Sequence, residues 1–365
     1  MKIHEICNHL ESFAPLGIQE PYDNSGLLVG HPNTEVQAAL ITLDCTEEVV
    51  EEAIEKQCQL IIAHHPIIFK GLKSLTGKNY VERTVIKAIQ HNIALYAIHT
   101  NLDNTLGGVN FKIAEKLNLQ DVEILLPKND QLMKLTVFVP TAHTGPLLDA
   151  LYAAGAGEIG NYSQCSFRTE GKGTFKPNEA ATPRIGQRNR YEEVDEHRIE
   201  VIFPFHRKNA VLAGMREGHV YEEIAYYLTP LSNRFQEVGS GAVGHLPEAM
   251  NGQDFLAFLK QALNVEVIKH TEIPDKEIKR IALCGGSGSF LLSAAKRSKA
   301  EVYISSDFKY HEYFDAEGEI MIADVGHFES EQFTKELIRD VLLKKFTNFA
   351  SYLSEVKTNP VSYYY

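Results

Sequence analysis

The regular alternation of strand-like and helix-like segments is the feature that most constrains the fold of this chain. In the first 125 residues, short runs with the character of buried strands are each followed by an amphipathic helical pattern. This alternation predicts an α/β fold, in which a mainly parallel sheet carries helices on both faces. The expected strands are Ala39–Leu43, Leu60–Ala63 and Ile93–Ile98, and the expected helices are Thr46–Lys56 with Thr46 as N-cap, Val81–Gln90 and Val109–Leu117.

The same pattern returns after about residue 240. We therefore expect residues 1–127 and 239–365 to be the two halves of one split α/β domain. The expected strands of the second half are Val265–Ile268, Ile278–Leu283, Val302–Ile304 and Ile320–Ala323, and its expected helices are Asp254–Ala262, one from Phe290, and Glu329 to about Lys345.

Between the halves, the order of expected elements is β-α-β-β-α-β, which is typical of a ferredoxin-like unit. Such a unit can fold by itself, so residues 128–238 are predicted to be an insert domain. The polar connection from Lys172 to Glu196 is predicted to be a mobile loop. The elements are strands at Leu132–Val139, Tyr162–Thr169, His197–Phe203 and Glu222–Leu228, and helices at Pro146–Ala153 and Lys208–Glu217.

Residues that commonly bind metals follow three of the expected strands. His64 and His65 end one buried strand, Asp103 lies in the loop after another, and His327 with Glu331 follows a third. Functional residues of α/β sheets gather at the carboxyl ends of strands. The spacing of His327 and Glu331 also puts both on one face of a helix that begins there. These five residues are therefore predicted to form a metal site.

The same residues favour two ions over one. Neighbours in a regular strand face opposite sides, so His64 and His65 share one ion only if the chain turns there, and otherwise serve different ions. Asp103 could bridge two cations, and a hydroxide between them would be the nucleophile of a two-metal centre. A single zinc would leave part of this ligand set idle. Two divalent ions per chain are expected, zinc foremost, with Mn, Fe or Co as alternatives.

A glycine-rich loop joins an expected strand to an expected helix near this site. Its residues Gly286, Ser287 and Gly288 could present backbone N–H groups to a phosphate of the substrate. The loop lacks the lysine of a P-loop, and a simple tight turn explains it equally well.

Three further residues are candidates for proton transfer or substrate contact. His99 follows a strand and could act as an acid/base or hold a ligand in place. Asp307 and His311 are spaced i, i+4 after another strand, so they could form an acid/base pair or contact the substrate. A surface salt bridge is the alternative for that pair.

Composition argues against several classes of partner. The net charge of −12, with no basic stripe, makes a nucleic acid an unlikely partner. Five scattered cysteines with no CxxC spacing disfavour disulfides and a zinc ribbon. No apolar run approaches the roughly 20 residues that span a bilayer, and the N-terminus does not resemble a signal peptide. We expect no membrane partner and a cytoplasmic location.

Taken together, these segments resemble the type 2 GTP cyclohydrolase I-like proteins, also called the NGG-interacting-factor family. The resemblance extends over nearly the whole chain, and its specificity lies in the combination. The matching segments are Tyr22 to Gly30, His64-His65-Pro66, His99 to Asp103, Gly285 to Gly288, Asp307 with Tyr310-His311, and Asp324 to Glu331.

This resemblance implies a dinuclear metal site with His64, His65, Asp103, His327 and Glu331 as ligands. It also implies a homohexamer and, for the longer bacterial form, a PII/CutA-like insert. Tyr22 stands where the family usually has Trp. Ser305-Ser306-Asp307 replaces a Thr-Gly-Asp type turn, which leaves the role of Asp307 open.

Two classes of function follow. The first is a metal-dependent hydrolase of a nucleotide or another phosphorylated small molecule. The resemblance implies opening of the GTP purine ring, although a phosphoesterase would need nearly the same residues. The second is a non-catalytic metal-binding regulatory or adaptor protein, whose insert senses a ligand or partner.

Overall fold

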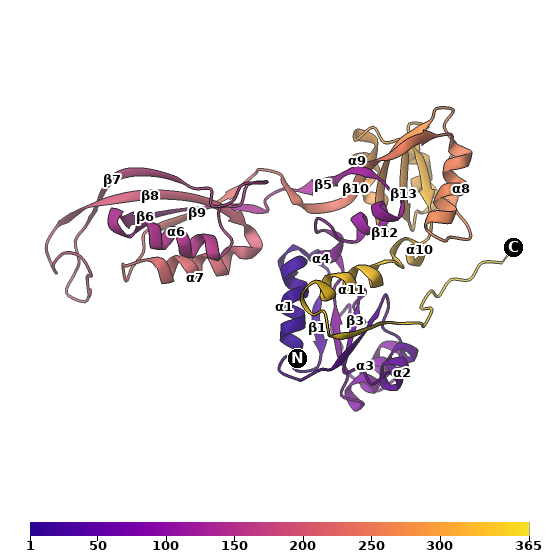
Figure 1. Ribbon diagram of the computed structural model, residues 1–365, viewed down its shortest axis with the longest axis horizontal. Helices are drawn as coiled ribbons and strands as arrows, with labels where there is room; N and C mark the ends of the chain where they lie inside the picture. The colour runs from indigo at the N-terminus through magenta and orange to yellow at the C-terminus, as the bar shows by residue number, and fades with distance from the viewer. Residues whose placement is uncertain (365) are drawn as a thin grey trace. The chain divides into compact units, whose positions relative to one another are not determined.

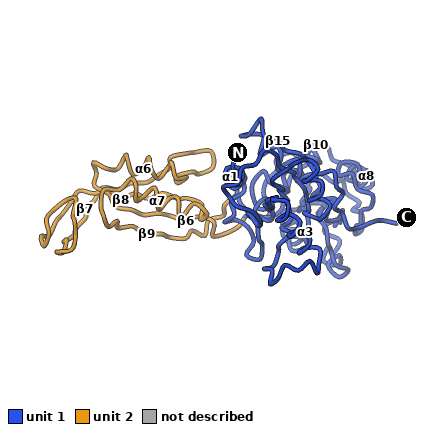
Figure 2. The backbone as a smooth tube through the Cα atoms, turned by 90° about the horizontal axis from the view of Figure 1, so that it is seen from below, with its two compact units in different colours: residues 1–127, 236–365 blue, residues 128–235 orange. Residues whose placement is uncertain are grey.

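The computed structural model describes residues 1–364, which form two compact units (Figure 2). Unit 1 combines Met1–Pro127 with the chain from Gln236 onward, and unit 2 is Lys128–Phe235. The predicted α/β class is confirmed, because three sheets alternate with helices along the chain. Among residues 1–364, none of the helices combines the length and apolar character that a bilayer crossing requires.

The first sheet of unit 1 has the order β1-β4-β3-β2-β15. Strands β15, β2, β3 and β4 are parallel to their neighbours, whereas β1 pairs with β4 in the antiparallel sense. The strand β15 comes from near the C-terminus and completes the sheet of the N-terminal half. The bounds are β1 Gly26–Val29, β2 Ala38–Thr42, β3 Leu60–Ala63, β4 Ala94–Ala97 and β15 Ala350–Leu353.

The second sheet of unit 1 has the order β11-β14-β13-β12-β10-β5. Its central strands β12, β13 and β14 are parallel, while β10 and β11 are antiparallel to their partners. The expectation of one mainly parallel sheet is therefore wrong: unit 1 has two mixed sheets. The bounds are β5 Gln120–Lys128, β10 Phe235–Met250, β11 Lys269–His270, β12 Ile278–Ser287, β13 Val302–Ser306 and β14 Met321–Asp324.

Helices pack against both faces of these sheets (Figure 1). One hydrophobic core is shared by the two sheets and includes α1 (Ile3–Phe13), α5 (Val109–Lys116), α8 (Gly252–Ala262) and α11 (Thr334–Lys345). Helices α2 (Glu47–Glu55) and α3 (Tyr80–Gln90) form another core on the other face of the first sheet. The short α9 (Leu292–Arg297) does the same for the second sheet.

The four residues of β3 are all apolar because both faces of this strand are buried. Leu60 and Ile62 point into the shared core, whereas Ile61 and Ala63 point into the core beneath α2 and α3. A strand buried on both faces reads as a continuous apolar run.

Two expected elements of the C-terminal half differ from the structure. Residues 265–268 form no strand, because Val265 is buried in the core without entering a sheet ladder. The long helix expected from Glu329 is broken into α10 (His327–Glu331) and α11. At the break, the Gln332 side chain donates to the backbone carbonyls of Leu263 and Glu329.

Unit 2 is a four-stranded antiparallel sheet of order β7-β8-β6-β9 with two helices and its own hydrophobic core. Strand β7 begins and ends later than the expected Tyr162–Thr169, and β8 begins earlier than expected, so the connecting loop covers only residues 176–191. The bounds are β6 Leu132–Pro140, α6 Thr144–Ala153, β7 Phe167–Phe175, β8 Glu192–Pro204, α7 Lys208–Gly218 and β9 Tyr226–Leu231.

Candidate metal centre

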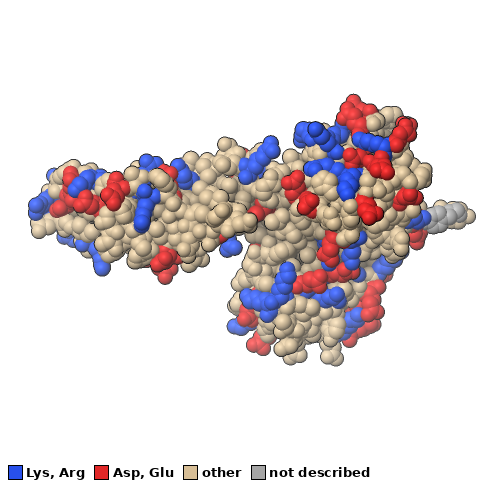
Figure 3. Space-filling view, turned by 45° about the horizontal axis from the view of Figure 1, so that its top comes forward, with Lys and Arg blue, Asp and Glu red and all other residues tan. Residues whose placement is uncertain are grey.

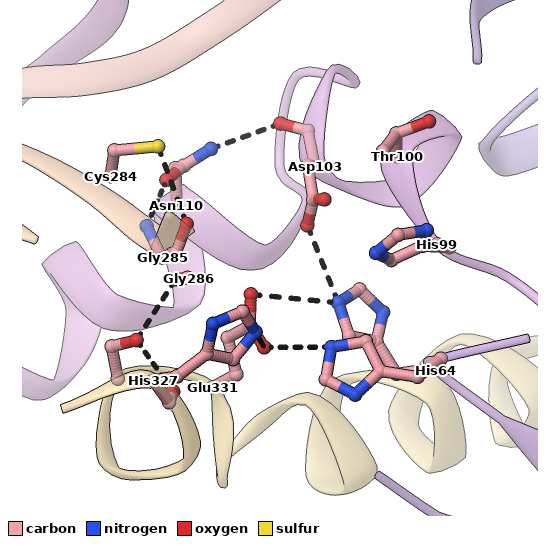
Figure 4. A network of polar contacts seen from close by, with 12 residues as sticks. His64, His99, Thr100, Asp103, Asn110, Cys284, Gly285, Gly286, His327 and Glu331 are labelled. Carbon is pink, nitrogen blue, oxygen red and sulfur yellow. Dashed lines mark hydrogen bonds and ion pairs between the residues drawn. The ribbon is translucent and has the colours of Figure 1, made fainter. Parts of the chain in front are cut away.

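The structure brings the five predicted metal ligands together, at the carboxyl ends of strands from both sheets of unit 1. His64 and His65 follow β3, and Asp103 ends the short helix α4 (Thr100–Asp103) after β4. His327 and Glu331 are the first and last residues of α10, which follows β14. Figure 4 shows the Glu331 carboxylate between the rings of His327 and His64.

One group of potential ligand atoms consists of His64, Asp103 and Glu331. The Nε2 atom of His64 lies 3.6 Å from Asp103 Oδ1 and 3.8 Å from Glu331 Oε1. Both His64 Nε2 and Asp103 Oδ1 are buried and have no hydrogen-bond partner within the described chain. Buried polar atoms are rarely left unpaired, so this pair of atoms is suited to hold a cation.

The other ring nitrogen of His64 fixes its tautomer. Its Nδ1–H donates to the Ile98 carbonyl over 2.8 Å, which leaves the lone pair on Nε2. Complete burial lowers the pKa of His64 to about 4, so the ring is neutral at pH 7. A neutral imidazole held by a carbonyl is the form that binds a metal ion.

A second group consists of His65, His327 and Glu331. Glu331 Oε2 lies 3.0 Å from His65 Nε2 and 3.1 Å from His327 Nε2. On the far side of each ring, Nδ1 faces a carboxylate at 2.7 Å, Asp44 for His65 and Asp307 for His327. A carboxylate behind a histidine is the usual support of a metal ligand.

Glu331 is shared by both groups, with Oε1 directed to the first and Oε2 to the second. Glu331 is only 3 % exposed. Asp103, the bridge predicted from the sequence, belongs to the first group, and its bridging role stays a prediction.

The carboxylates strongly favour positive charge at this centre. Burial disfavours a charged His65, but its hydrogen bonds to Asp44 and Glu331 outweigh burial and raise the pKa of His65 to about 10. In the same way, Glu331 and Asp307 overcome burial and raise the pKa of His327 to about 9. Metal ions would replace the protons that these pKa values imply.

His99 lies beside the two groups. A ring nitrogen of His99 is within 4.8 Å of ligand nitrogens of His64 and His65. Its Nδ1 faces Asp23 Oδ1 at 2.8 Å, and Asp23 also accepts from the backbone N–H of Thr100. Burial alone would raise the pKa of Asp23, but the hydrogen bonds from His99 and Thr100 lower it. Asp23 is therefore ionised and orients His99.

The glycine loop is engaged within the protein. The N–H of Gly286 donates to Ser330 Oγ and that of Gly285 to Asn110 Oδ1, both at 2.9 Å. The structure therefore offers no free donor at these two positions for a phosphate. Ser287 and Gly288, the other predicted phosphate contacts, lie where β12 ends.

Gly286 has a different role, because it makes room for Glu331. A Cβ atom at position 286 would lie 2.3 Å from Glu331 Oε1. The backbone of Gly286 also has a φ of +63°, which favours glycine.

Asp307 and His311 are not brought together. Asp307 contacts His327, as described above, and is itself exposed. His311 lies in the exposed 3-10 turn η5 (Tyr310–Ala316), with ring contacts to Tyr310 and Phe314. Within residues 1–364, no interaction joins His311 to the ligand groups.

Sequence reasoning missed Asp23 and Asp44. Asp44 comes just after β2, as His64 comes after β3, so the rule of strand ends could have found it. Asp23 lies in the matched segment from Tyr22 to Gly30, but no spacing linked it to His99.

A groove of about 550 Å³ opens beside the second group. His65 and His327 line one side, and Asn359, Val361 and Tyr363 of the C-terminal segment line another. This volume suits a small molecule.

This chain is similar to known proteins over nearly its whole length. The profile of the Duf34/NIF3 (NGG1p interacting factor 3) family matches residues 1–360. A protein of Halalkalibacterium halodurans called GTP cyclohydrolase 1 type 2 homolog is 40% identical over 364 residues, covering 98% of each chain. Its Bacillus subtilis namesake is 37% identical over 369 residues, again covering 98% of each. The crystal structure of a Bacillus cereus protein related to NIF3 superimposes with a TM-score of 0.86 at 37% identity, covering 100% of this chain and 99% of the other.

Proposed function

We propose that this chain, which belongs to the Duf34/NIF3 family, is a metal-dependent hydrolase with two divalent ions per chain. The proposed ligands are His64, Asp103 and Glu331 for one ion, and His65, His327 and Glu331 for the other. The observation that carries the proposal is the shared Glu331 carboxylate next to the unpaired His64 Nε2 and Asp103 Oδ1. Zinc is the first candidate, with Mn, Fe or Co as alternatives, since histidines and carboxylates suit all four.

Bound divalent ions supply Lewis acidity and lower the pKa of water. The protein's own contribution is to hold His64 neutral through the Ile98 carbonyl and to orient His65 and His327 through Asp44 and Asp307. His99 is held by Asp23 and lies close to the ligand nitrogens of His64 and His65, where it could take up or release a proton during the reaction. His311 is a weaker candidate for that role, because it is exposed and has no contact with His99 in the described chain.

The proposed substrate is a nucleotide or another phosphorylated small molecule. The names of the Halalkalibacterium and Bacillus relatives suggest opening of the GTP purine ring. The groove beside His65 and His327 offers the space for such a molecule. Ser287, Gly288 and Asp307 are retained as proposed substrate contacts, whereas Gly286 is assigned to the fit of Glu331.

The test is turnover by metal-replete protein over a panel of GTP, other nucleotides and phosphoesters. We expect His64→Ala to abolish turnover of the active compound, and His91→Ala, an exposed histidine after α3, to leave it unchanged. If protein with two ions per chain processes no compound in the panel, the hydrolase proposal fails. The alternative, a metal-binding regulatory or adaptor protein, would then be favoured.

We also propose that residues 128–238 are a ferredoxin-like insert of PII/CutA type, flanked by halves 1–127 and 239–365. The order β6-α6-β7-β8-α7-β9 supports this assignment. A cytoplasmic homohexamer is part of the same proposal and follows from the family resemblance. Light scattering should give six times the chain mass of 40.9 kDa, and a monomeric mass would contradict the hexamer.

A further inference from the structure

Unit 2 contains a hollow of about 430 Å³ that the metal centre does not use. It lies among β7, the 176–191 loop and residues 221–227. Two aromatic pairs line it, Phe138 with Tyr227 and Phe175 with Tyr221, each with ring centroids 5.8 Å apart. Apolar and aromatic walls of this size are typical of sites for small molecules.

A buried carboxylate forms part of the wall. Glu196 is only 7 % exposed, and the Tyr221 hydroxyl interacts with its carboxylate. A buried charge is costly unless enough hydrogen-bond donors meet it. The chain makes room for it with a glycine, because a Cβ atom at Gly173 would lie 2.0 Å from Glu196 Oε2.

The hydroxyl of Tyr221 is buried and faces Glu196, and it has no closer hydrogen-bond partner in the described chain. The backbone at Tyr221 is held in place because its N–H donates to His219 Nδ1, while His219 Nε2–H donates to the Phe138 carbonyl. Both nitrogens of His219 are thus used, so it cannot serve Glu196. A carboxylate and a phenol hydroxyl therefore face one another in one hollow, and the carboxylate can accept further hydrogen bonds.

Cations lie at the open side of the same hollow. Lys176 and Arg184 are exposed and belong to its lining, and the part of the chain that the structure describes provides no ion-pair partner for either. Lys172, also in the lining, is already paired with Asp195 at 2.7 Å. The hollow therefore combines an inner hydrogen-bond acceptor, aromatic side chains and a rim where Lys176 and Arg184 lie beside Glu222 and Glu223.

We propose that this hollow binds a small planar heterocycle that donates N–H groups to Glu196 and directs an anionic substituent toward Lys176 and Arg184. The two oxygens of one carboxylate accept two parallel N–H bonds, as on the N1–H and N2–H edge of guanine. Guanosine 5′-monophosphate has that edge, a flat ring and a phosphate. Adenosine 5′-monophosphate has the ring and the phosphate but an acceptor at N1, so it should be rejected.

The test is calorimetric titration of the full-length His64→Ala protein, in which the metal centre is impaired, with guanosine 5′-monophosphate. We expect saturable binding to one site per chain. Glu196→Gln should weaken it at least tenfold, because the amide has one acceptor oxygen in place of two, and Tyr221→Phe several-fold, because it removes the buried hydroxyl. Adenosine 5′-monophosphate should bind at least tenfold more weakly.

Glu200→Gln is the matched control. Glu200 lies on the same strand β8 and the same face as Glu196, but it is paired with Lys134 outside the hollow. Its substitution should leave the affinity unchanged. Circular dichroism must show that each variant melts as a folded protein. The proposal is overturned if guanosine 5′-monophosphate gives no saturable binding, if folded Glu196→Gln and Tyr221→Phe bind like the parent, or if both nucleotides bind equally.

Discussion

Glu331 is the residue on which both proposed ion sites depend. Its two oxygens face different histidines, whereas Asp103 faces only the first group. Because the Glu331 carboxylate belongs to both ligand groups, its removal should weaken metal binding at both. Removal of the Asp103 carboxylate should weaken metal binding at the first group alone.

We therefore predict different metal contents for two conservative variants. Glu331→Gln should lose both ions, because an amide is a much poorer ligand than a carboxylate and the histidines lose their common counter-charge. Asp103→Asn should lose one ion and keep the one at His65 and His327. Elemental analysis of purified protein measures this. Equal metal loss in the two variants would contradict Glu331 as the shared ligand.

Gly286 offers a second prediction at this scale. Gly286→Ala should lower metal content and destabilise the fold by about 1–3 kcal/mol, because the added Cβ meets Glu331 and the φ is positive. Gly145→Ala is the control, since a Cβ there meets no atom within 4 Å. Metal analysis and denaturant unfolding give the two readouts. If the alanine variant kept full metal content, Gly286 would not be needed for the position of Glu331.

The ligands could be predicted from the sequence because each follows a strand or begins a helix, which is a local property. Which carboxylate supports which histidine could not be predicted. Asp44 and Asp307 were not identifiable as partners of His65 and His327, since those hydrogen bonds join residues 21 and 20 positions apart. The phosphate role of Gly286 was inferred from loop composition, which does not show that its N–H is already bonded to Ser330.

At the scale of elements, the beginning of α3 shows how one side chain orders a loop. Glu82 is 2 % exposed, and its carboxylate accepts from the N–H groups of Thr76 and Lys78. Asn79 caps the helix by accepting from the Glu82 N–H. These backbone hydrogen bonds, that of Thr76 foremost, lower the pKa of Glu82 to about 2.

This pKa predicts a pH-dependent contribution to stability. A carboxyl whose pKa is lower in the folded state stabilises the fold above its unfolded pKa, here about 4.5, and the contribution is lost as the pH falls toward about 2. The stability difference between wild type and Glu82→Gln should be constant near pH 7 and shrink below about pH 4.5. Unfolding in urea at a series of pH values measures it. Glu55→Gln, at an exposed site of α2, should show no such trend.

The periodicity of the sequence located most elements of unit 1 well. The strand Leu60–Ala63 was predicted correctly because a strand buried on both faces is uniformly apolar. The N-cap at Thr46 was also predicted correctly, since its side chain accepts a hydrogen bond from Val49 N. The prediction of a strand at Val265–Ile268 from periodicity failed, because Val265 is buried without belonging to a β-sheet. Periodicity also failed at Gln332, where a side chain interrupts what reads as one helix.

For the whole molecule, unit 2 is predicted to fold without unit 1. Its core of buried residues, including Leu135, Leu151, Phe203 and Met215, draws on residues of unit 2 alone. A fragment of residues 128–235 should therefore unfold in one cooperative transition, followed by circular dichroism. Leu135→Ala in the fragment should lower its stability by about 2–5 kcal/mol. A non-cooperative melt would show that unit 2 depends on the rest of the chain.

The pairing of strands across the chain lay beyond local sequence patterns. The alternation predicted one sheet, but it carries no information on which strands become neighbours. The structure divides the strands between two sheets with one shared core. The interspersed charges of Figure 3 agree with the absence of a basic stripe in the sequence, at least on the face drawn.

The position of β15 has a consequence for biosynthesis. Ala350 pairs with Ala38, so the edge of β2 lacks its neighbour until residue 350 has been translated. At about 5–20 residues per second, that interval is on the order of tens of seconds. During it, the nascent N-terminal half exposes an apolar strand edge, which is a template for aggregation. The proposed metal site is also completed late in translation, since His64 and His65 are synthesised long before Glu331. Folding of unit 1 is therefore expected to be complete only after β15 has emerged, and protection by a chaperone would matter most before then.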